Sequence, residues 1–310
     1  MKKITFIAAL LISAASFAQI ASTSFEEPGV VAIQYVDTGD ATTAHDLENN
    51  VDEPFVDFTS TGGEMGFDAR YEPYDEPGTG LTDGDWVGVT GFTGDVTDFS
   101  DGVQGYGIGD SDGNFILEFD TVDLTGYTGV TLTLDYYINE TGYEGDGTEN
   151  TSGSDRFRIY VKDLTNATEI DILNTEGSDI NDLLIEGAWI NGSADLVAGS
   201  NVQLVVESRT NSGSETLYLD NVVIDGTLGT NDFDASQFSM FPNPATKGFV
   251  NIASQLGGDK TIAVYDVLGK QVINTTIAND RLDVSELASG IYIVKISQEN
   301  STSTKKLVVK

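Results

Sequence analysis

The sequence of 310 residues contains no cysteine and a single histidine, His45. The lack of cysteine excludes disulfides, thiolate catalysis and thiolate metal sites. One histidine excludes histidine-rich zinc centres, although a site built from carboxylates is not excluded. His45 lies in a polar, acidic stretch, and we expect it at the surface rather than in a metal site. Beyond the N-terminal region, no segment approaches the length of apolar residues that a bilayer span requires, so we expect no membrane insertion.

Basic residues are scarce in residues 19–236, where five of them face 44 acidic residues, a net charge of −39. A surface of this sign repels phosphate backbones and anionic lipid, so no nucleic-acid or membrane-surface partner is expected. Self-repulsion of this size destabilises a compact state unless something neutralises part of it, and divalent cations are the obvious candidates. From residue 237 onward, eight basic residues face six acidic ones, which indicates a separate module.

The first eighteen residues have the pattern of a secretory signal peptide. A short basic region, Met1-Lys2-Lys3, is followed by an apolar core over residues 4–12 and by the small-x-small site Ser16-Phe17-Ala18. The apolar core is about half the length that a bilayer span needs. We therefore predict a signal peptide over residues 1–18, with the mature chain starting at Gln19.

Residues 19–226 have the strand pattern of one all-β domain. Apolar and polar residues alternate in runs separated by clusters of Gly, Asp and Asn, and no long amphipathic helix is evident. These runs cover residues 115–119, 130–136, 156–161, 202–207 and 216–224. Strands at such intervals predict a β-sandwich or jelly roll. We interpret residues 227–236 as a linker.

Residues 237–310 predict a second, smaller β-sandwich of the immunoglobulin-like kind. The alternating runs here are residues 249–252, 261–265, 271–277, 291–296 and 306–309. Gly269 suits a hairpin turn that needs positive φ, and Gly290 interrupts the chain just before a strand. Pro242 and Pro244 remove two backbone donors and mark the entry to the module.

Three phrases in this module carry a family resemblance: FPNPA at 241–245, VYDVLGK at 264–270 and LASGIYIVK at 287–295, followed by a terminal KKLVVK. In this order and spacing they resemble the type A C-terminal sorting domain of the type IX secretion system of Bacteroidota. The resemblance implies recognition by the outer-membrane translocon, export to the cell surface or the medium, and usually removal of the domain. The residues that carry the sorting signal would be Pro242, Asn243, Pro244, Gly269, Gly290, Tyr292, Lys305 and Lys306.

The edges of the central domain resemble jelly-roll carbohydrate-binding modules and related extracellular adhesion domains. The resemblance is carried by Ser24-Phe25-Glu26, by residues 189–193 and by the closing strand 217–224. It implies a structural calcium shared by the first and last strands, with Glu26 and Asp220 as ligands, and hard oxygen ligands suit calcium. It also implies non-catalytic glycan binding.

A second calcium candidate is the loop at residues 110–114, where Asp110 and Asp112 place carboxylates at alternate positions. It is not an EF-hand, because the glycine comes too early and no glutamate follows at the twelfth position. The acidic turns at 83–85 and 144–147 are weaker candidates, since Asp and Gly are also what ordinary turns need.

Glycan binding asks for exposed aromatic rings flanked by polar groups, because sugar rings present apolar faces. Trp86 and Tyr143 stand in loops rich in Gly and Asp, so we expect them to be exposed. Trp189 is a third candidate, although a tryptophan just before a strand-rich stretch is more often part of the core than a ligand platform. Extracellular polysaccharide is the partner that these residues predict.

Two other functions compete with glycan binding. The first is a structural or adhesive surface protein without a small ligand. The second is a glycoside hydrolase or lyase, in which Glu118 and Asp120 would share one strand face. The GDSDG string at 109–113 matches a nucleophile elbow, but no histidine follows it in the chain. We therefore predict a non-catalytic protein.

Overall fold

The computed structural model describes residues 17–310, except 28–33, 62, 77–79, 92–93, 229–237, 255–257 and 299–300. Of the predicted signal peptide, residues 1–18, the first sixteen lie outside the described residues, and residues 17 and 18 begin the first strand. The chain divides into two compact units, residues 1–228 and 229–310, here called the large and the small unit. The helices in the described residues are two 3-10 turns, Gly80–Thr82 (η1) and Ile180–Asp182 (η2), and none of them has the length and apolar character to span a membrane. The predicted all-β class is confirmed.

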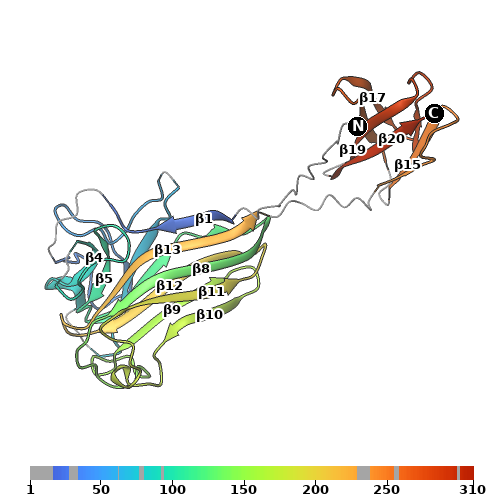
Figure 1. The fold of residues 1–310 in the computed structure, drawn as a ribbon. Coiled ribbons are helices and arrows are strands. Elements are labelled where there is room, and N and C mark those ends of the chain that lie inside the picture. Colours follow the sequence, from blue (N-terminus) through green and yellow to red (C-terminus); the bar gives the residue numbers. More distant parts are fainter. Residues whose placement is uncertain are drawn as a thin grey trace, which may run out of the picture. The chain divides into compact units, whose positions relative to one another are not determined.

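The first sheet of the large unit consists of six strands: Phe17–Thr23 (β1), Trp86–Thr90 (β4), Gly105–Gly109 (β5), Tyr127–Ile138 (β8), Trp189–Leu196 (β11) and Thr216–Leu228 (β13). Their order is β11-β8-β13-β5-β4, with β1 also paired to β13. The pairs are antiparallel, and β13 and β8 form the centre of the sheet in Figure 1. The first strand of the described chain, β1, therefore pairs with the last strand of the unit, β13.

The second sheet consists of seven strands: His45–Asp46 (β2), Phe67–Glu72 (β3), Gly113–Phe119 (β6), Val122–Asp123 (β7), Arg156–Asp163 (β9), Thr168–Asn174 (β10) and Asn201–Thr210 (β12). Their order is β10-β9-β12-β6-β3-β2, with β7 paired to β12. The chain crosses repeatedly between the two sheets, so that few sequence neighbours pair, as in jelly rolls.

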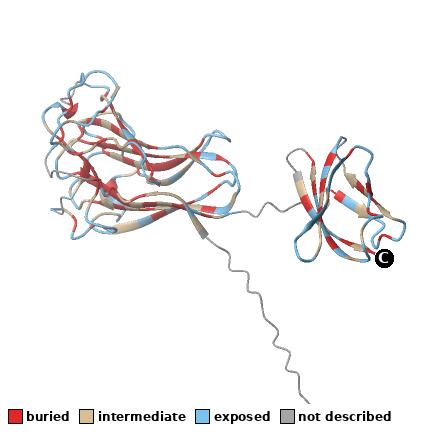
Figure 2. Cartoon of the chain, turned by 90° about the horizontal axis from the view of Figure 1, so that it is seen from above, coloured by how far each residue is buried: buried red, intermediate tan, exposed pale blue. Residues whose placement is uncertain are grey.

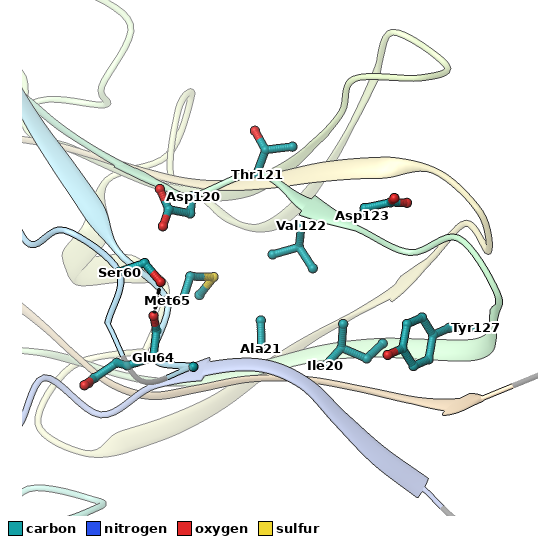
Figure 3. Close-up of a pocket in the computed structure, with 11 residues that line it drawn as sticks. Ile20, Ala21, Ser60, Glu64, Met65, Asp120, Thr121, Val122, Asp123 and Tyr127 are labelled. Atoms are coloured by element: carbon teal, nitrogen blue, oxygen red, sulfur yellow. Dashed lines mark hydrogen bonds between the residues drawn. The ribbon is translucent and has the colours of Figure 1, made fainter.

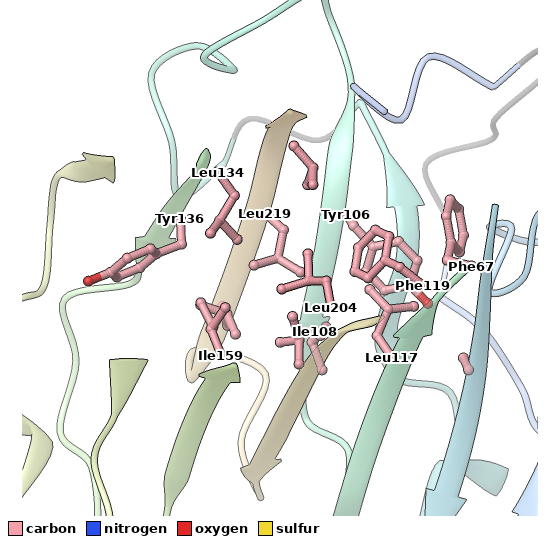
Figure 4. Packing of buried hydrophobic residues seen from close by; sticks show 14 of the residues in the cluster. Phe67, Tyr106, Ile108, Leu117, Phe119, Leu134, Tyr136, Ile159, Leu204 and Leu219 are labelled. Carbon is pink, nitrogen blue, oxygen red and sulfur yellow. The ribbon is translucent and has the colours of Figure 1, made fainter. Parts of the chain in front are cut away.

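The core lies between the two sheets, as the alternation of the strands requires. Along β6 and β9, buried and partly exposed residues alternate, so one face of each strand is apolar. Figure 2 shows buried and exposed residues along the strands of both sheets. Leu134 and Leu219 of the first sheet pack with Ile159 and Leu204 of the second in one buried cluster (Figure 4). Phe25, Phe67 and Tyr106 add edge-on and tilted aromatic contacts at one end, with ring centroids 5.3 to 5.6 Å apart.

The small unit is a sandwich of a three-stranded and a four-stranded sheet. Its strands are Phe238–Phe241 (β14), Phe249–Ser254 (β15), Lys260–Tyr265 (β16), Gln271–Ile277 (β17), Arg281–Asp283 (β18), Gly290–Gln298 (β19) and Ser301–Val309 (β20). The orders are β14-β15-β18 and β17-β16-β19-β20. A separate apolar cluster, including Ile252, Val264, Val294 and Leu307, fills the space between them.

Candidate functional site

A row of aromatic residues crosses the outer face of the first sheet. Gly107 of β5 lies opposite Tyr218 of β13, Tyr218 lies opposite Tyr137 of β8, and Tyr137 lies opposite Trp189 of β11. Directly opposed residues share a face of the sheet, so these side chains stand side by side. The Tyr137 ring lies 6.3 Å from Tyr218 and 5.7 Å from Trp189, centroid to centroid.

The connection between β4 and β5 folds over this row. Within residues 94–104 of that connection, Val96 and Phe99 pack against the aromatic row in a small apolar cluster of their own. The Trp189 indole nitrogen donates to the Asp98 carbonyl at 2.9 Å, and the Tyr218 hydroxyl donates to Asp95 Oδ2 at 2.9 Å. Trp189, which the sequence offered as a ligand-binding residue, is thus engaged in packing and in holding this connection.

Glu26 and Asp220, the predicted calcium pair, hold the same connection. Asp220 is fully buried, and its carboxylate accepts hydrogen bonds from the Asp101 amide at 2.7 Å and the Ser100 hydroxyl at 3.0 Å. Glu26 Oε1 accepts from the Val103 amide at 2.6 Å. Burial raises the pKa of Asp220 to about 6, although the hydrogen bonds that it accepts oppose that shift. These donors already occupy carboxylate oxygens that a cation would need.

Next to this connection, a hollow opens between Trp86 and Tyr218. Its floor is formed by Gly88 of β4 and Gly107 of β5, and Pro54 and Thr90 complete the lining. Pro54 and the Phe55 carbonyl cover Gly88, where an added Cβ would lie within 2.9 Å of both. Trp86 is 38% exposed, in agreement with the predicted exposure of this residue. Trp86 and Tyr218 therefore border a small depression of about 20 Å³, in which Trp86 is the exposed aromatic residue and Tyr218 is buried.

Tyr143 is not available as a binding platform, contrary to the sequence-based expectation. Only 6% of this residue is exposed, its ring packs edge-on against Phe157 at 5.6 Å, and its hydroxyl donates to the Asn139 carbonyl. The neighbouring Gly and Asp residues indicated an exposed loop. In fact this connection folds back onto the end of the sandwich and carries the ring into the core.

Asp110 and Asp112 flank the start of β6, and both take positive φ angles, 56° and 43°. Their surroundings include Asp85, which is 1% exposed and has no hydrogen-bond donor to either carboxylate oxygen. Burial and the neighbouring carboxyl groups raise the pKa of Asp85 to about 9. The sequence placed Asp85 in an ordinary turn, whereas the structure buries it beside the predicted loop.

A three-acid group lies elsewhere, at Glu144, Asp155 and Glu215. In the described part of the chain, this is the one set of three acidic or histidine side chains whose ligand atoms all lie within 4.8 Å of one another. Neither predicted calcium pair belongs to such a set. The three residues are separated by up to 71 positions in the chain, so no local motif could have predicted the group.

A pocket of about 380 Å³ lies between β1, the residues before β3, and β7 (Figure 3). Glu64, Asp120 and Asp123 line it together with Met65 and Tyr127, and no basic side chain is among its described lining residues. Asp120 Oδ2 accepts a hydrogen bond from the Gly66 amide at 3.0 Å. Glu118, its partner in the catalytic alternative, pairs with Lys162 at 2.8 Å on the outer face of the second sheet.

The outer face of the second sheet carries most of the basic residues of the large unit. Arg158 pairs with Glu169 and Asp171, at 2.7 Å in each case, and its guanidinium lies 3.8 Å from the centroid of the Tyr160 ring. Arg156 pairs with Glu207 at 3.2 Å. The positive charges of this face are thus matched by neighbouring acids, which leaves the net field of the unit negative.

In the small unit, the predicted signal residues cluster around the last strand and the β16–β17 hairpin. The Asn243 amide nitrogen donates to the Lys306 carbonyl at 2.6 Å, and Asn243 Oδ1 accepts from the Val308 amide at 2.9 Å. Gly269 has a φ of 81° in the hairpin turn, as predicted. The Tyr292 hydroxyl donates to the Ala288 carbonyl. Of the other signal residues, Pro242 and Pro244 follow cis peptide bonds, Gly290 begins β19, and Lys305 and Lys306 lie on β20.

Residues 239–310 match the family described as the secretion system C-terminal sorting domain. The chain is therefore a secreted, all-β protein with a C-terminal sorting domain. The type IX system exports it across the outer membrane to the cell surface or the extracellular space. The small unit is the part of the chain that engages the secretion machinery.

Solved structures give weak similarities. PorZ, a bacterial surface component of the type IX secretion system of Porphyromonas gingivalis, matches 28% of this chain and 14% of its own length, with 16% identity and a TM-score of 0.22. A β-glucuronidase from Ruminococcus gnavus matches 64% of this chain and 36% of its own, with 12% identity and a TM-score of 0.20. The β-glucuronidase of Faecalibacterium prausnitzii matches 64% of this chain and 37% of its own, with 12% identity and a TM-score of 0.21. The chain thus spans little more than a third of these proteins at most, and no curated protein matches it.

Proposed function

We propose that the large unit is a non-catalytic glycan-binding module, displayed or released outside the outer membrane. The observation that supports this most directly is the hollow between Trp86 and Tyr218 with its floor of Gly88 and Gly107. The C–H face of a sugar ring packs on an exposed indole, and Trp86 is the exposed aromatic residue of the hollow. The Asp95 carboxylate, which accepts a hydrogen bond from the Tyr218 hydroxyl, is a nearby polar group suited to sugar hydroxyls.

The charge of the unit narrows the class of glycan. Acidic residues outnumber basic ones by 39 in residues 19–236, and the basic residues of the second sheet are already paired with acids. A sulfated or uronate-rich polymer would be repelled by this field. A neutral polysaccharide is therefore the ligand class that we propose.

We propose a non-catalytic module because Glu118 and Asp120, the candidate catalytic carboxylates, already have other partners. Lys162 pairs with Glu118, and the Gly66 amide donates to Asp120. A glycosidase needs one carboxyl as an acid and another as a nucleophile or base, placed on either side of the scissile bond. Loss of polysaccharide turnover in Glu118→Gln would instead favour the hydrolase or lyase alternative.

The test is binding of insoluble and soluble neutral polysaccharides by the full chain and by Trp86→Ala. Loss of one aromatic platform should weaken binding about tenfold or more, which corresponds to about 1.4 kcal/mol or more. Val103→Ala is a matched control, because Val103 is exposed and lies outside the lining of the hollow. Absence of binding by the wild-type chain to any neutral glycan would favour the structural or adhesive alternative.

We also propose a structural calcium at Asp110 and Asp112. The buried Asp85 beside them supports this site, because two unpartnered carboxylate oxygens in the interior are costly without a cation or a proton. At Glu26 and Asp220, calcium would have to displace hydrogen bonds from the β4–β5 connection, so that pair has the weaker support. If calcium binds there, EDTA should lower the melting temperature of the wild type by more than that of Asp110→Asn. An equal lowering in both proteins would refute calcium binding at this site.

A further inference from the structure

The acids of the three-acid group lie next to strands of both sheets of the large unit. Glu144 lies in the β8–β9 connection, Asp155 directly precedes β9, and Glu215 directly precedes β13. One carboxylate oxygen from each lies within 4.8 Å of the other two. The fold therefore brings together charges that, in an unfolded chain of this composition, would stay apart.

Two of the three carboxylates are inside the protein. Asp155 is 1% exposed and Glu215 is 2% exposed, whereas Glu144 lies at the surface. Asp155 Oδ2 accepts from the Glu144 amide at 2.5 Å, but its Oδ1 is buried without any hydrogen-bond donor. Glu215 Oε2 accepts from the Asn211 amide at 3.0 Å. A buried carboxylate oxygen without a donor is costly unless a cation or a proton neutralises it.

Hydrogen bonds hold the loop around these acids in place. Arg209 is buried and donates to the Ser154 carbonyl at 2.6 Å and to the Gly147 carbonyl at 2.7 Å. Gly145 has a φ of 71°, and a Cβ on it would lie 2.6 Å from the Gly153 carbonyl oxygen, so the chain folds back there at a separation that only glycine permits. The carboxylates are thus fixed by the loop before any ligand arrives.

Among the described residues, no salt bridge involves Glu144, Asp155 or Glu215. The Asp155 charge acts on the buried Arg209, but the Arg209 guanidinium donates to the Ser154 and Gly147 carbonyls and not to the acids. Burial, together with the neighbouring carboxyl groups, raises the pKa of both Asp155 and Glu215. This shift expresses the cost of keeping the acids charged side by side.

We propose that Glu144, Asp155 and Glu215 bind a divalent cation of the calcium class. The ligand atoms are all carboxylate oxygens, and hard oxygen ligands suit calcium, whereas zinc sites in proteins draw on histidine and cysteine. The chain has no cysteine, and its one histidine, His45, lies on β2. Calcium also tolerates irregular coordination completed by water and carbonyls, which fits one exposed and two buried acids better than the strict octahedron of magnesium.

The bound cation would connect the β8–β9 connection to the segment that leads into β13. Three carboxylates and one divalent ion leave a single negative charge, so the repulsion within the group is largely removed. This site shares no ligand with the Asp110 and Asp112 site or with the Trp86 hollow, although the Asp110 charge reaches Glu215. It can therefore be correct even if the glycan or the first calcium proposal fails.

Calorimetric titration with calcium alone, on the full chain after dialysis against EDTA, tests the site. Glu144→Gln is the principal variant, since Glu144 is exposed and its loss leaves the core intact. We expect it to lose one equivalent of calcium or to weaken one site about tenfold or more. Glu149→Gln is the matched control, because Glu149 is an exposed acid of the same loop outside the group, and it should bind calcium as the wild type does.

Terbium luminescence gives a second readout that does not depend on variant stability. The buried Tyr143 ring is close enough to Asp155 and Glu215 for their charges to act on its hydroxyl. Excitation of tyrosine should therefore sensitise terbium bound to the group in the wild type and in Glu149→Gln, and the emission should fall in Glu144→Gln. Equal calcium stoichiometry and affinity in the two variants, or no calcium binding by the wild type, would overturn the proposal and leave a shared proton as the neutralising species.

Discussion

The Asp220 carboxylate and the Asp101 amide form a 2.7 Å hydrogen bond that fastens the β4–β5 connection to the centre of the first sheet. The Ser100 hydroxyl and the Asn221 amide donate to the same carboxylate. Asp220 thus organises a segment more than a hundred residues away in the sequence. The covering of Tyr137, Tyr218 and Trp189 depends on this attachment.

Asp220→Asn should lower the free energy of unfolding by about 1 to 3 kcal/mol. The amide keeps one acceptor oxygen, but its NH2 group would face a backbone amide or hydroxyl that now donates to the carboxylate. Urea denaturation followed by tryptophan fluorescence measures this, since Trp189 binds the same connection. Asp225→Asn, at an exposed position of the same strand, should be nearly neutral. Equal stabilities of the two variants would show that the connection is held without Asp220.

The pKa of His45 should lie above 6.5. Burial lowers this pKa, but the hydrogen bond to the Thr43 carbonyl and the pairing with Asp37, at 2.7 Å, together raise it. Because this is the only histidine, its ring protons in an NMR titration need no assignment. Asp37→Asn should bring the pKa down, and Asp40→Asn should change it less, since Asp40 acts only through its charge.

The raised pKa of His45 determines how its contribution to stability changes with pH. A histidine that binds its proton more tightly when folded stabilises the protein fully below pH 6.5 and loses that contribution as the pH rises through the folded-state pKa. His45→Gln should therefore destabilise the protein more at pH 6 than at pH 9. A difference in unfolding free energy that does not change with pH would contradict the pairing with Asp37.

Gly107→Ala should weaken neutral-glycan binding by filling the floor of the hollow. The added Cβ would lie 3.3 Å from Tyr218 Cε1 and 3.5 Å from Thr90 Cγ2, which is tight but not prohibitive. Affinity by isothermal titration should fall about tenfold, with a change in unfolding free energy of about 1 kcal/mol or less. Gly91→Ala is the matched control, since its Cβ would make an ordinary 3.5 Å contact with the Val103 carbonyl outside the hollow. Unchanged affinity in Gly107→Ala would place the glycan elsewhere.

Asn243→Ala should impair export through loss of order in the small unit. Asn243 bonds β20 through both amide atoms, at 2.6 and 2.9 Å, and their loss should cost about 1 kcal/mol. Immunoblots of medium and cell fractions, in a host with the type IX system, would measure the retained fraction. Thr304→Ala, exposed on the same strand, should be exported normally. Normal export of both variants would show that this clamp is not needed for recognition.

Local alternation predicted several of the strands with one buried face, but not β3 or β11. The run at 156–161 corresponds to β9, Arg156–Asp163, and the run at 271–277 coincides with β17. Strand β5 was missed, because its sequence, Gly105-Tyr106-Gly107-Ile108-Gly109, has the composition of a loop. Its glycines are accommodated by contacts from Phe99 and Tyr218, which the sequence does not reveal.

The candidate site was predicted only in part. Exposure of Trp86 followed from its local sequence, but the burial of Tyr143 depends on Phe157, which approaches it only after the sandwich forms. In the same way, the turn at 144–147 looked like a solvated loop. The acids that turn it into a group, Asp155 and Glu215, come from other strand ends. The excess of acidic residues indicated that cations would be needed, but composition does not reveal which acids lie close together in the folded protein.

The positions of the few basic residues have a consequence for survival outside the cell. Residues 19–228 contain five lysines and arginines, and all five lie within strands: Arg70 in β3, Arg156, Arg158 and Lys162 in β9, and Arg209 in β12. Proteases cut most readily at exposed, unpaired loop segments. A trypsin-like protease therefore finds no lysine or arginine in any connection between strands within residues 19–228, and the abundant acidic loops there offer it no cleavage site.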